Sequence, residues 1–148
     1  MLKLSCFADL NLFLLLLLSN CCMQKALMEL FESLQKYKRQ CPWGQQQSFE
    51  AQLAELQSEV EELKEALERN DSAEIIDEYG DVLGDVLLLG VIAEDKGFFS
   101  IKEAIEKMHA KLQRRAPWVF GNEKIASREE AIKRWNEIKG QEKACGKK

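Results

Sequence analysis

The spacing of apolar residues predicts an amphipathic helix over residues 24–40. Positions three and four apart in this segment are apolar, which places them on one side of a helix: Leu27, Leu30, Phe31, Leu34 and Tyr37. The segment "CPWG" follows, and Pro42 disfavours helical geometry at Cys41. We therefore expect this helix to end at about Gln40.

Two more helices are predicted between Ser48 and Asp95, separated by the turn signal "RNDS". The earlier helix carries an apolar seam with the three-four alternation of helices that pack nearly parallel: Leu53, Leu56, Val60, Leu63 and Leu67. The later helix begins at Asp71 or Ser72, with Glu74 as a capping-box partner of Asp71. Its middle reads as buried, because apolar residues continue from position 75 to position 89.

Two further capping boxes open the last predicted helices: Ser100 with Glu103 and Ser127 with Glu130. These helices are expected to end at Pro117 and near Gly140. The chain is therefore predicted to be all-α, a compact bundle of about five helices. Its 148 residues, 46% hydrophobic and 31% charged, fit one soluble globular domain that buries a core.

The amino terminus is interpreted separately, because residues 12–18 form a run of seven apolar side chains. That run is too short to span a bilayer, which takes about 20 residues. A signal peptide is disfavoured, because "SNC" is a poor cleavage site. We interpret residues 1–22 as a hydrophobic extension of doubtful status, residues 23–140 as the folded domain and residues 141–148 as a polar tail.

Five cysteines form no C-x-x-C pair and no zinc spacing with the single histidine. An odd, irregularly placed set is typical of structural thiols in a reducing compartment. The cytoplasm is therefore the expected location. Export or membrane association through residues 1–22 is the alternative.

The net charge of -4 conceals an acidic and a basic segment. Residues 50–85 contain thirteen acidic residues and two basic ones, whereas residues 102–148 contain thirteen basic and seven acidic residues. The two segments either pair as solvated faces or bind a cation and an anion side by side, such as a metal and a phosphate. Nucleic-acid binding is disfavoured, since the basic patches are small and lack interleaved aromatic residues.

Carboxylates interrupt the apolar pattern of the "EYGDVLGDVLLLG" helix at Glu78, Asp81 and Asp85. On the preceding helix, Glu59 and Glu62 have the same three-residue spacing as Glu78 and Asp81, and such pairs share one side of a helix. If the two helices pack antiparallel, four carboxylates converge, and only a cation makes their closeness tolerable. Oxygen ligands favour Mg²⁺, with Mn²⁺ as the alternative.

Other interpretations of these residues stay open. Glu59 and Glu62 could belong to a solvated face, and Glu106 with His109 offers one half of a di-iron motif, which needs two such pairs. Asp85 either hydrogen-bonds a ligand or lies in a dimer interface. Gly80 and Gly84 indicate that another backbone or a ligand comes close to their helix.

Five segments in order resemble the MazG nucleoside triphosphate pyrophosphohydrolases, within residues 24–142: "CPWGQQQS", "EVEELKEAL", "EYGDVLGDVLL", "KLQRRAPWVFG" and "RWNEIKGQE". The resemblance implies an all-α fold that dimerises through helices. It implies Mg²⁺-dependent hydrolysis of nucleoside triphosphates to monophosphate and pyrophosphate, a house-cleaning activity on the nucleotide pool. One departure is Gly44, because CPW in this family is usually followed by Asp.

Carried over residue by residue, the resemblance assigns the metal ligands and catalytic carboxylates as Glu59, Glu62, Glu78 and Asp81. It assigns the nucleotide contacts as Lys111, Arg115, Trp135 and Lys139. Of the other tryptophans, Trp43 is expected to plug the bundle, with stacking on a base as the alternative, and Trp118 is expected to lie in the core. The alternative function is a non-catalytic helical dimerisation module, or a sensor that binds nucleotide or metal without hydrolysis.

Overall fold

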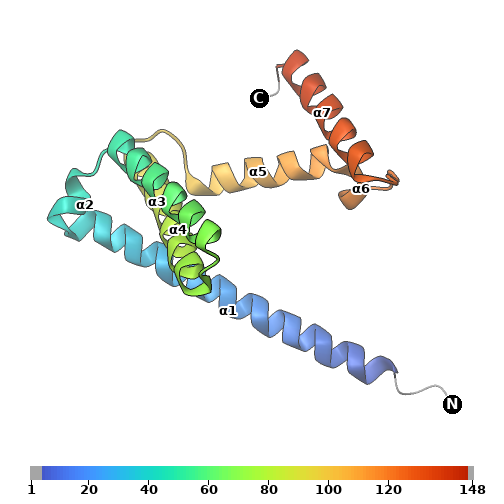
Figure 1. Cartoon of the computed structure of the whole chain (residues 1–148), viewed down its shortest axis with the longest axis horizontal. Helices are drawn as coiled ribbons and strands as arrows, with labels where there is room; N and C mark the ends of the chain where they lie inside the picture. The colour runs from blue at the N-terminus through green and yellow to red at the C-terminus, as the bar shows by residue number, and fades with distance from the viewer. Residues whose placement is uncertain (1–4, 147–148) are drawn as a thin grey trace. The chain divides into compact units, whose positions relative to one another are not determined.

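The structure is a computed structural model that describes the backbone of residues 5–146 and the side chains of residues 21–146. Within that stretch of the chain there are seven helices and no strand (Figure 1), so the all-α prediction is confirmed. The helices are α1 Ser5–Gln40, α2 Pro42–Gln46, α3 Phe49–Arg69, α4 Ser72–Asp95, α5 Ile101–Arg115, α6 Pro117–Phe120 and α7 Arg128–Ala144. They form two compact units, Met1–Phe98 and Phe99–Lys148, which are described separately.

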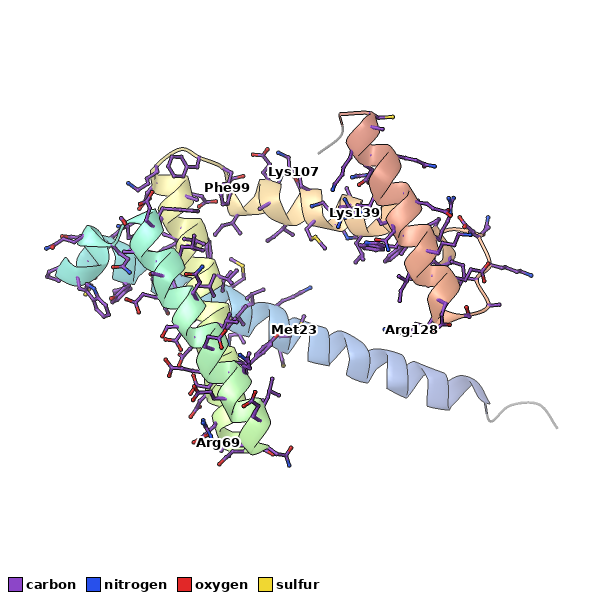
Figure 2. The ribbon with its side chains drawn as sticks, turned by 45° about the horizontal axis from the view of Figure 1, so that its top comes forward. Met23, Arg69, Phe99, Lys107, Arg128 and Lys139 are labelled. Carbon is purple, nitrogen blue, oxygen red and sulfur yellow. The ribbon has the colours of Figure 1, made fainter. Side chains whose placement is uncertain are left out.

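The first unit is built on the antiparallel pair α3 and α4, which lie side by side, with α1 packed against α4 (Figures 1 and 2). Ser48 caps α3, because its Oγ accepts a hydrogen bond from the Ala51 amide at 3.1 Å. Asn70 ends that helix in the left-handed conformation, with φ of 55°. Asp71 then caps α4 by accepting hydrogen bonds from the Ala73 and Glu74 amides. These local contacts fix the short turn that brings two acidic helices together.

The capping box predicted at Asp71 is only half formed. The Glu74 carboxylate pairs with Arg69 at 2.7 Å, close to the α3–α4 turn where Figure 2 labels Arg69. The Asp71 amide donates instead to the Ala66 carbonyl at 3.4 Å. The reciprocal bond is therefore replaced by an exposed ion pair across the turn.

In the second unit, α5 packs against α6 and α7. The serine half of both predicted capping boxes forms, since Ser100 accepts a hydrogen bond from the Glu103 amide and Ser127 accepts one from the Glu130 amide, each at 3.1 Å. The Glu130 carboxylate accepts from the Ala126 amide at 2.9 Å instead of from the amide of Ser127. Helix α7 runs four residues beyond Gly140, into the segment predicted to be a polar tail. Glu142 in that segment is buried, because it joins α7 to the arginines at the end of α5.

Two helix predictions need correction. The first helix begins at Ser5 rather than Gln24, so its backbone continues through most of the predicted extension, whose residues 1–4 and whose side chains up to position 20 lie outside the described residues. Two short helices, α2 and α6, each starting at a proline, were also not predicted. Within the described residues, no helix combines the length and apolar character that a membrane crossing requires.

Burial in the first unit is concentrated at the carboxyl-terminal end of α4, at Leu88, Val91, Ile92 and Ala93. The middle of α4 was predicted to be buried, but there Ile76, Tyr79 and Val86 are exposed. The predicted seam of α3 is similarly divided. Every seventh residue, Leu53, Val60 and Leu67, is exposed, whereas Leu56 and Leu63 are half-buried. A single copy of the chain thus leaves an apolar surface on both helices uncovered.

Candidate functional site

Three of the predicted metal ligands meet between α3 and α4. Glu59, on α3, and Glu78 and Asp81, on α4, each place one carboxylate oxygen within 4.8 Å of the others. The antiparallel pair produces this meeting, because Glu78 and Asp81 are three residues apart and share one side of α4. Glu59 and Glu78 are half-buried and Asp81 is exposed. We call these three residues the carboxylate trio.

Glu62, the fourth predicted ligand, lies beside the trio without belonging to it. Its carboxylate accepts a hydrogen bond from the Ser58 hydroxyl at 3.4 Å, one turn earlier on α3. Its negative charge nevertheless acts on both Glu59 and Glu78 and raises the pKa of each. The structure therefore places all four carboxylates in one region, with three in direct proximity.

Repulsion among these carboxylates is not relieved by the protein itself. Burial, followed by the charges of Glu62 and Asp81, raises the pKa of Glu59. The pKa of Glu78 is raised in the same way, by burial and then by Glu62 and Asp81. Among the described residues, no ion pair to a lysine or arginine involves any of the four. Such a set of oxygen donors fits a hard divalent cation.

The di-iron alternative finds no support at this site. Glu106 pairs with Lys102 at 2.9 Å on the surface of α5, and His109 is exposed on the same helix. Glu106 and His109 are both exposed, and the carboxylate trio contains no imidazole. The donor set is oxygen throughout.

The residues predicted to contact a nucleotide lie in the second unit. Arg115 is held on two sides. Its guanidinium carbon lies over the Trp135 ring, 5.6 Å from the ring centroid, and its Nε and Nη2 donate hydrogen bonds to Glu142 Oε2 at 2.8 and 2.7 Å. Arg114 donates to the other oxygen of Glu142 at 3.1 Å, and these arginines lower the pKa of that carboxyl. Glu142 was not identified from the sequence, because it falls in the predicted tail.

Lys111 and Lys139 each lie one helical turn from this contact. Lys111 precedes Arg115 by four residues on α5, and Lys139 follows Trp135 by four on α7, spacings that place each pair on one side of its helix. Figure 2 labels Lys139 on α7, where its side chain is exposed. The four predicted residues are thus grouped on the facing helices of one unit. Trp118, predicted to lie in the core, is half-buried beside Trp135 in a shallow hollow of about 230 Å³.

A cavity of about 290 Å³ lies next to the carboxylate trio in the first unit. Glu59 belongs to both, since it also lines this cavity together with residues of α1, α2, α3 and α4. Trp43 lines it too, but 67% of this residue is exposed, so the prediction that it plugs the bundle is wrong. The Trp43 ring instead lies edge-to-face with the Tyr37 ring, with 6.4 Å between the two ring centroids.

Asp85 and Gln52 face the same cavity. Burial raises the pKa of Asp85, and a hydrogen bond from the Gln52 side chain acts in the opposite direction. Gln52 is 2% exposed, so this contact with Asp85 lies in the interior of the first unit. Sequence reasoning missed Gln52, because a glutamine on the polar side of an amphipathic helix gives no signal of burial.

The glycines of the site differ in their surroundings. A Cβ on Gly44 would lie 2.8 Å from the Tyr37 carbonyl oxygen, so any other residue there would require α2 to move away from α1. Gly80 and Gly84 were predicted to admit a close neighbour, but a Cβ there would meet nothing within 4 Å in this single chain. The close approach that the structure shows is at Gly44, where α2 meets α1.

Comparison with known proteins gives consistent matches. The sequence profile of the MazG nucleotide pyrophosphohydrolase domain matches residues 47–120. The chain is 38% identical over 108 residues to the nucleoside triphosphate pyrophosphohydrolase/pyrophosphatase MazG of Thermotoga maritima, covering 73% of this chain and 40% of that protein. It is 29% identical over 118 residues to the nucleoside triphosphate pyrophosphohydrolase of Escherichia coli K12, covering 80% and 45%. The chain thus spans less than half the length of these relatives.

One solved structure is matched over nearly its whole length. The crystal structure of a mazG-related protein from Thermotoga maritima aligns with a TM-score of 0.70 and 41% sequence identity. The alignment covers 76% of this chain and 98% of that one. The fold and the sequence therefore agree on the same set of relatives.

Proposed function

Because this chain belongs to the MazG nucleotide pyrophosphohydrolase family, we propose that it hydrolyses nucleoside triphosphates to nucleoside monophosphates and pyrophosphate, with Mg²⁺ as cofactor. The observation that carries the proposal is the meeting of three unpaired carboxylates, Glu59, Glu78 and Asp81, within 4.8 Å. The curated relatives named as nucleoside triphosphate pyrophosphohydrolases support the reaction class. Removal of unwanted nucleotides from the cellular pool is the role that this reaction would serve.

The carboxylate trio would hold the metal, with Glu62 beside it as a further ligand or as an acceptor for metal-bound water. Bound Mg²⁺ supplies Lewis-acid polarisation of phosphate oxygens and a lower pKa for a bound water. Mn²⁺ has the same preference for oxygen ligands and is the alternative ion. The raised pKa values of Glu59 and Glu78 support this assignment, because a nearby cation would favour their charged forms.

In the reaction we propose, the oxygen of a water molecule attacks the α-phosphorus while one carboxylate of the four accepts its proton. The bond between the α-phosphorus and the oxygen that bridges it to the β-phosphorus breaks, and pyrophosphate leaves. Lys111, Arg115 and Lys139 would neutralise negative charge on the phosphates, and Trp135 would orient Arg115 by stacking. Glu142 would fix the same guanidinium from its other side.

We also propose that the protein acts as a homodimer formed through helices. The exposed apolar residues of α3 and α4 support this proposal, because Leu53, Val60 and Leu67 recur every seven residues along one side of α3. A second copy supplies an apolar surface of matching spacing, and symmetric self-association is the commonest form of assembly. Uncovered apolar stripes of this kind mark interaction surfaces.

The test is to incubate the full chain with Mg²⁺ and a panel of ribo- and deoxynucleoside triphosphates, and to follow pyrophosphate separately from phosphate. Asp81→Asn and Glu62→Gln should each lower kcat at least a hundredfold while the helical circular dichroism is retained, because each removes a charge from the metal site. Glu61→Gln is the matched control, since Glu61 lies on the same helix but pairs with Lys64 at 2.8 Å. Phosphate release without pyrophosphate, or full activity in both variants, would contradict the proposal.

A further inference from the structure

Two neighbouring arginines at the end of α5 share one carboxylate. Adjacent residues of a helix point in directions about 100° apart, so Arg114 and Arg115 would not meet by themselves. Glu142 of α7 joins them, because its Oε1 accepts a hydrogen bond from Arg114 Nε at 3.1 Å and its Oε2 accepts from Arg115 Nε and Nη2 at 2.8 and 2.7 Å. Both guanidinium groups are therefore held at a single carboxylate.

The three side chains differ in their exposure to solvent. Those of Glu142 and Arg115 are 9% and 16% exposed, whereas that of Arg114 is 49% exposed. Breaking a buried ion pair leaves an uncompensated charge in the interior, so Glu142 does not readily release the arginines. Glu142 is thus a fixed support, and Arg114 is the member of the group that a ligand can reach.

Arg114 also keeps most of its hydrogen-bonding capacity. An arginine side chain carries N–H donors on Nε and on both Nη atoms. The bond to Glu142 uses Nε alone, and in the part of the chain that the structure describes the Nη groups of Arg114 donate to no other protein atom. Such a planar fork of donors matches the oxygen atoms of a phosphate group.

The charges around Arg114 favour an anion. Glu142 neutralises only one of the two arginines that it joins. Lys111 and Lys139, from the same two helices, add positive charge, and neither lysine forms an ion pair within the described residues. A ligand with several negative charges close together, such as a pyrophosphate group, suits this surface.

We propose that Arg114 is a further substrate-binding residue, which contacts the pyrophosphate part of the nucleoside triphosphate, and that Glu142 is a positioning residue that holds Arg114 beside Arg115. This inference rests on the proposed hydrolysis of nucleoside triphosphates and adds two residues to its phosphate site. Two guanidinium groups at one carboxylate match two adjacent phosphoryl groups. Glu142 acts only through the arginines, because both of its oxygens already accept from them.

The test is to titrate inorganic pyrophosphate into the full chain in the presence of Mg²⁺ and to measure Kd by calorimetry. Arg114→Met should raise Kd about tenfold, because hydrogen bonds to charged groups are the strong ones. A residue that only docked α7 onto α5 would lower the melting temperature and leave Kd unchanged. Arg114→Lys keeps the charge but loses the fork, so Kd should rise about threefold.

Arg134→Met is the matched control. Arg134 is an arginine of the same unit, and it donates to the Glu123 carboxylate at 2.7 Å. This variant removes one positive charge and one arginine–glutamate pair, as Arg114→Met does. The Kd for pyrophosphate should nevertheless stay at the wild-type value, and an equal rise in both variants would overturn the contact assigned to Arg114.

Glu142→Gln tests the positioning role by the sign of its effect. The substitution removes a negative charge, which by Coulomb attraction alone would strengthen the binding of an anion. The amide leaves one acceptor oxygen for two arginines, so loss of positioning should instead raise Kd about threefold. A lower or unchanged Kd would overturn the role of Glu142.

Binding and turnover, measured separately, distinguish this inference from the reaction itself. Pyrophosphate binding that Arg114→Met weakens supports the site, even if no nucleotide yields pyrophosphate, and only the reaction is then overturned. Turnover by wild type, with no binding of pyrophosphate or with a Kd that Arg114→Met leaves unchanged, overturns the inference and leaves the reaction standing. If Arg114→Met does not fold, Arg114→Lys decides, since a wild-type Kd in that variant overturns the contact.

Discussion

Gly44→Ala tests the contact that places α2 over the cavity. The new Cβ would lie 2.8 Å from the Tyr37 carbonyl oxygen and 3.0 Å from the Tyr37 ring. The backbone oxygen cannot rotate away, because it also accepts a hydrogen bond from the Cys41 amide at 2.9 Å. The substitution therefore forces α2 and α1 apart.

The magnitude follows from that distance. Ordinary contact begins at 3.4 Å, so the two backbones must separate by roughly 0.6 Å. The Lys38 ammonium, which donates to three carbonyls at the end of α2 at 2.9 to 3.2 Å, would be stretched by the same movement. Overpacking of this kind typically costs about 1–3 kcal/mol.

Gly140→Ala is the matched control, because Gly140 lies inside α7 and a Cβ there would meet nothing within 4 Å. Alanine favours a helix over glycine by about 1 kcal/mol in both variants, so this gain largely cancels in the comparison. Urea unfolding followed by circular dichroism should make Gly44→Ala less stable than Gly140→Ala by about 1–3 kcal/mol. Equal stabilities, or a more stable Gly44→Ala, would refute the reasoning.

Two further predictions concern the first unit. Glu78→Gln should raise the melting temperature of the metal-free protein at pH 8 but change it little at pH 4, as circular dichroism in the presence of a chelator would record. Burial and the charge of Glu62 raise the pKa of Glu78 above its ordinary 4.5. The stability that the protonated Glu78 carboxyl contributes is therefore present below pH 4.5 and is lost as the pH rises through the raised pKa. An unchanged melting temperature at pH 8 would count against repulsion in the trio. Mg²⁺ at a hundred times its Kd should stabilise wild type by about 2.7 kcal/mol and this variant by much less. Gly84→Ala should stabilise a lone chain by up to about 1 kcal/mol, since its Cβ would meet nothing within 4 Å. In the proposed dimer, the same substitution could lower both the stability and the association constant measured by sedimentation, and that result would reveal that the second copy packs against this glycine.

The helix ends could be predicted from the sequence because they depend on contacts within a few residues. Ser48, Ser100 and Ser127 each cap the helix that they were expected to open, with an oxygen accepting from a backbone amide three residues later. The meeting of Glu59 with Glu78 and Asp81 was also accessible. It needs only two regular helices joined by a short turn, and residue spacing then fixes which side chains meet.

Features that depend on distant packing could not be predicted. Gln52 is buried because α3 packs beside other elements of the first unit, whereas its own neighbours in sequence place it on a polar side. Val60 and Leu67 read as core because apolar residues at a heptad spacing do not reveal whether their partner belongs to the same chain. Glu142 was assigned to a tail, since its arginine partners lie 27 and 28 residues earlier.

Glu59 belongs to the trio and also lines the cavity. A substitution at Glu59 would therefore change the proposed metal site and the wall of the cavity together. Gln52 and Asp85 line the same cavity without belonging to the trio, so substitutions there would reshape the wall and leave the three carboxylates in place.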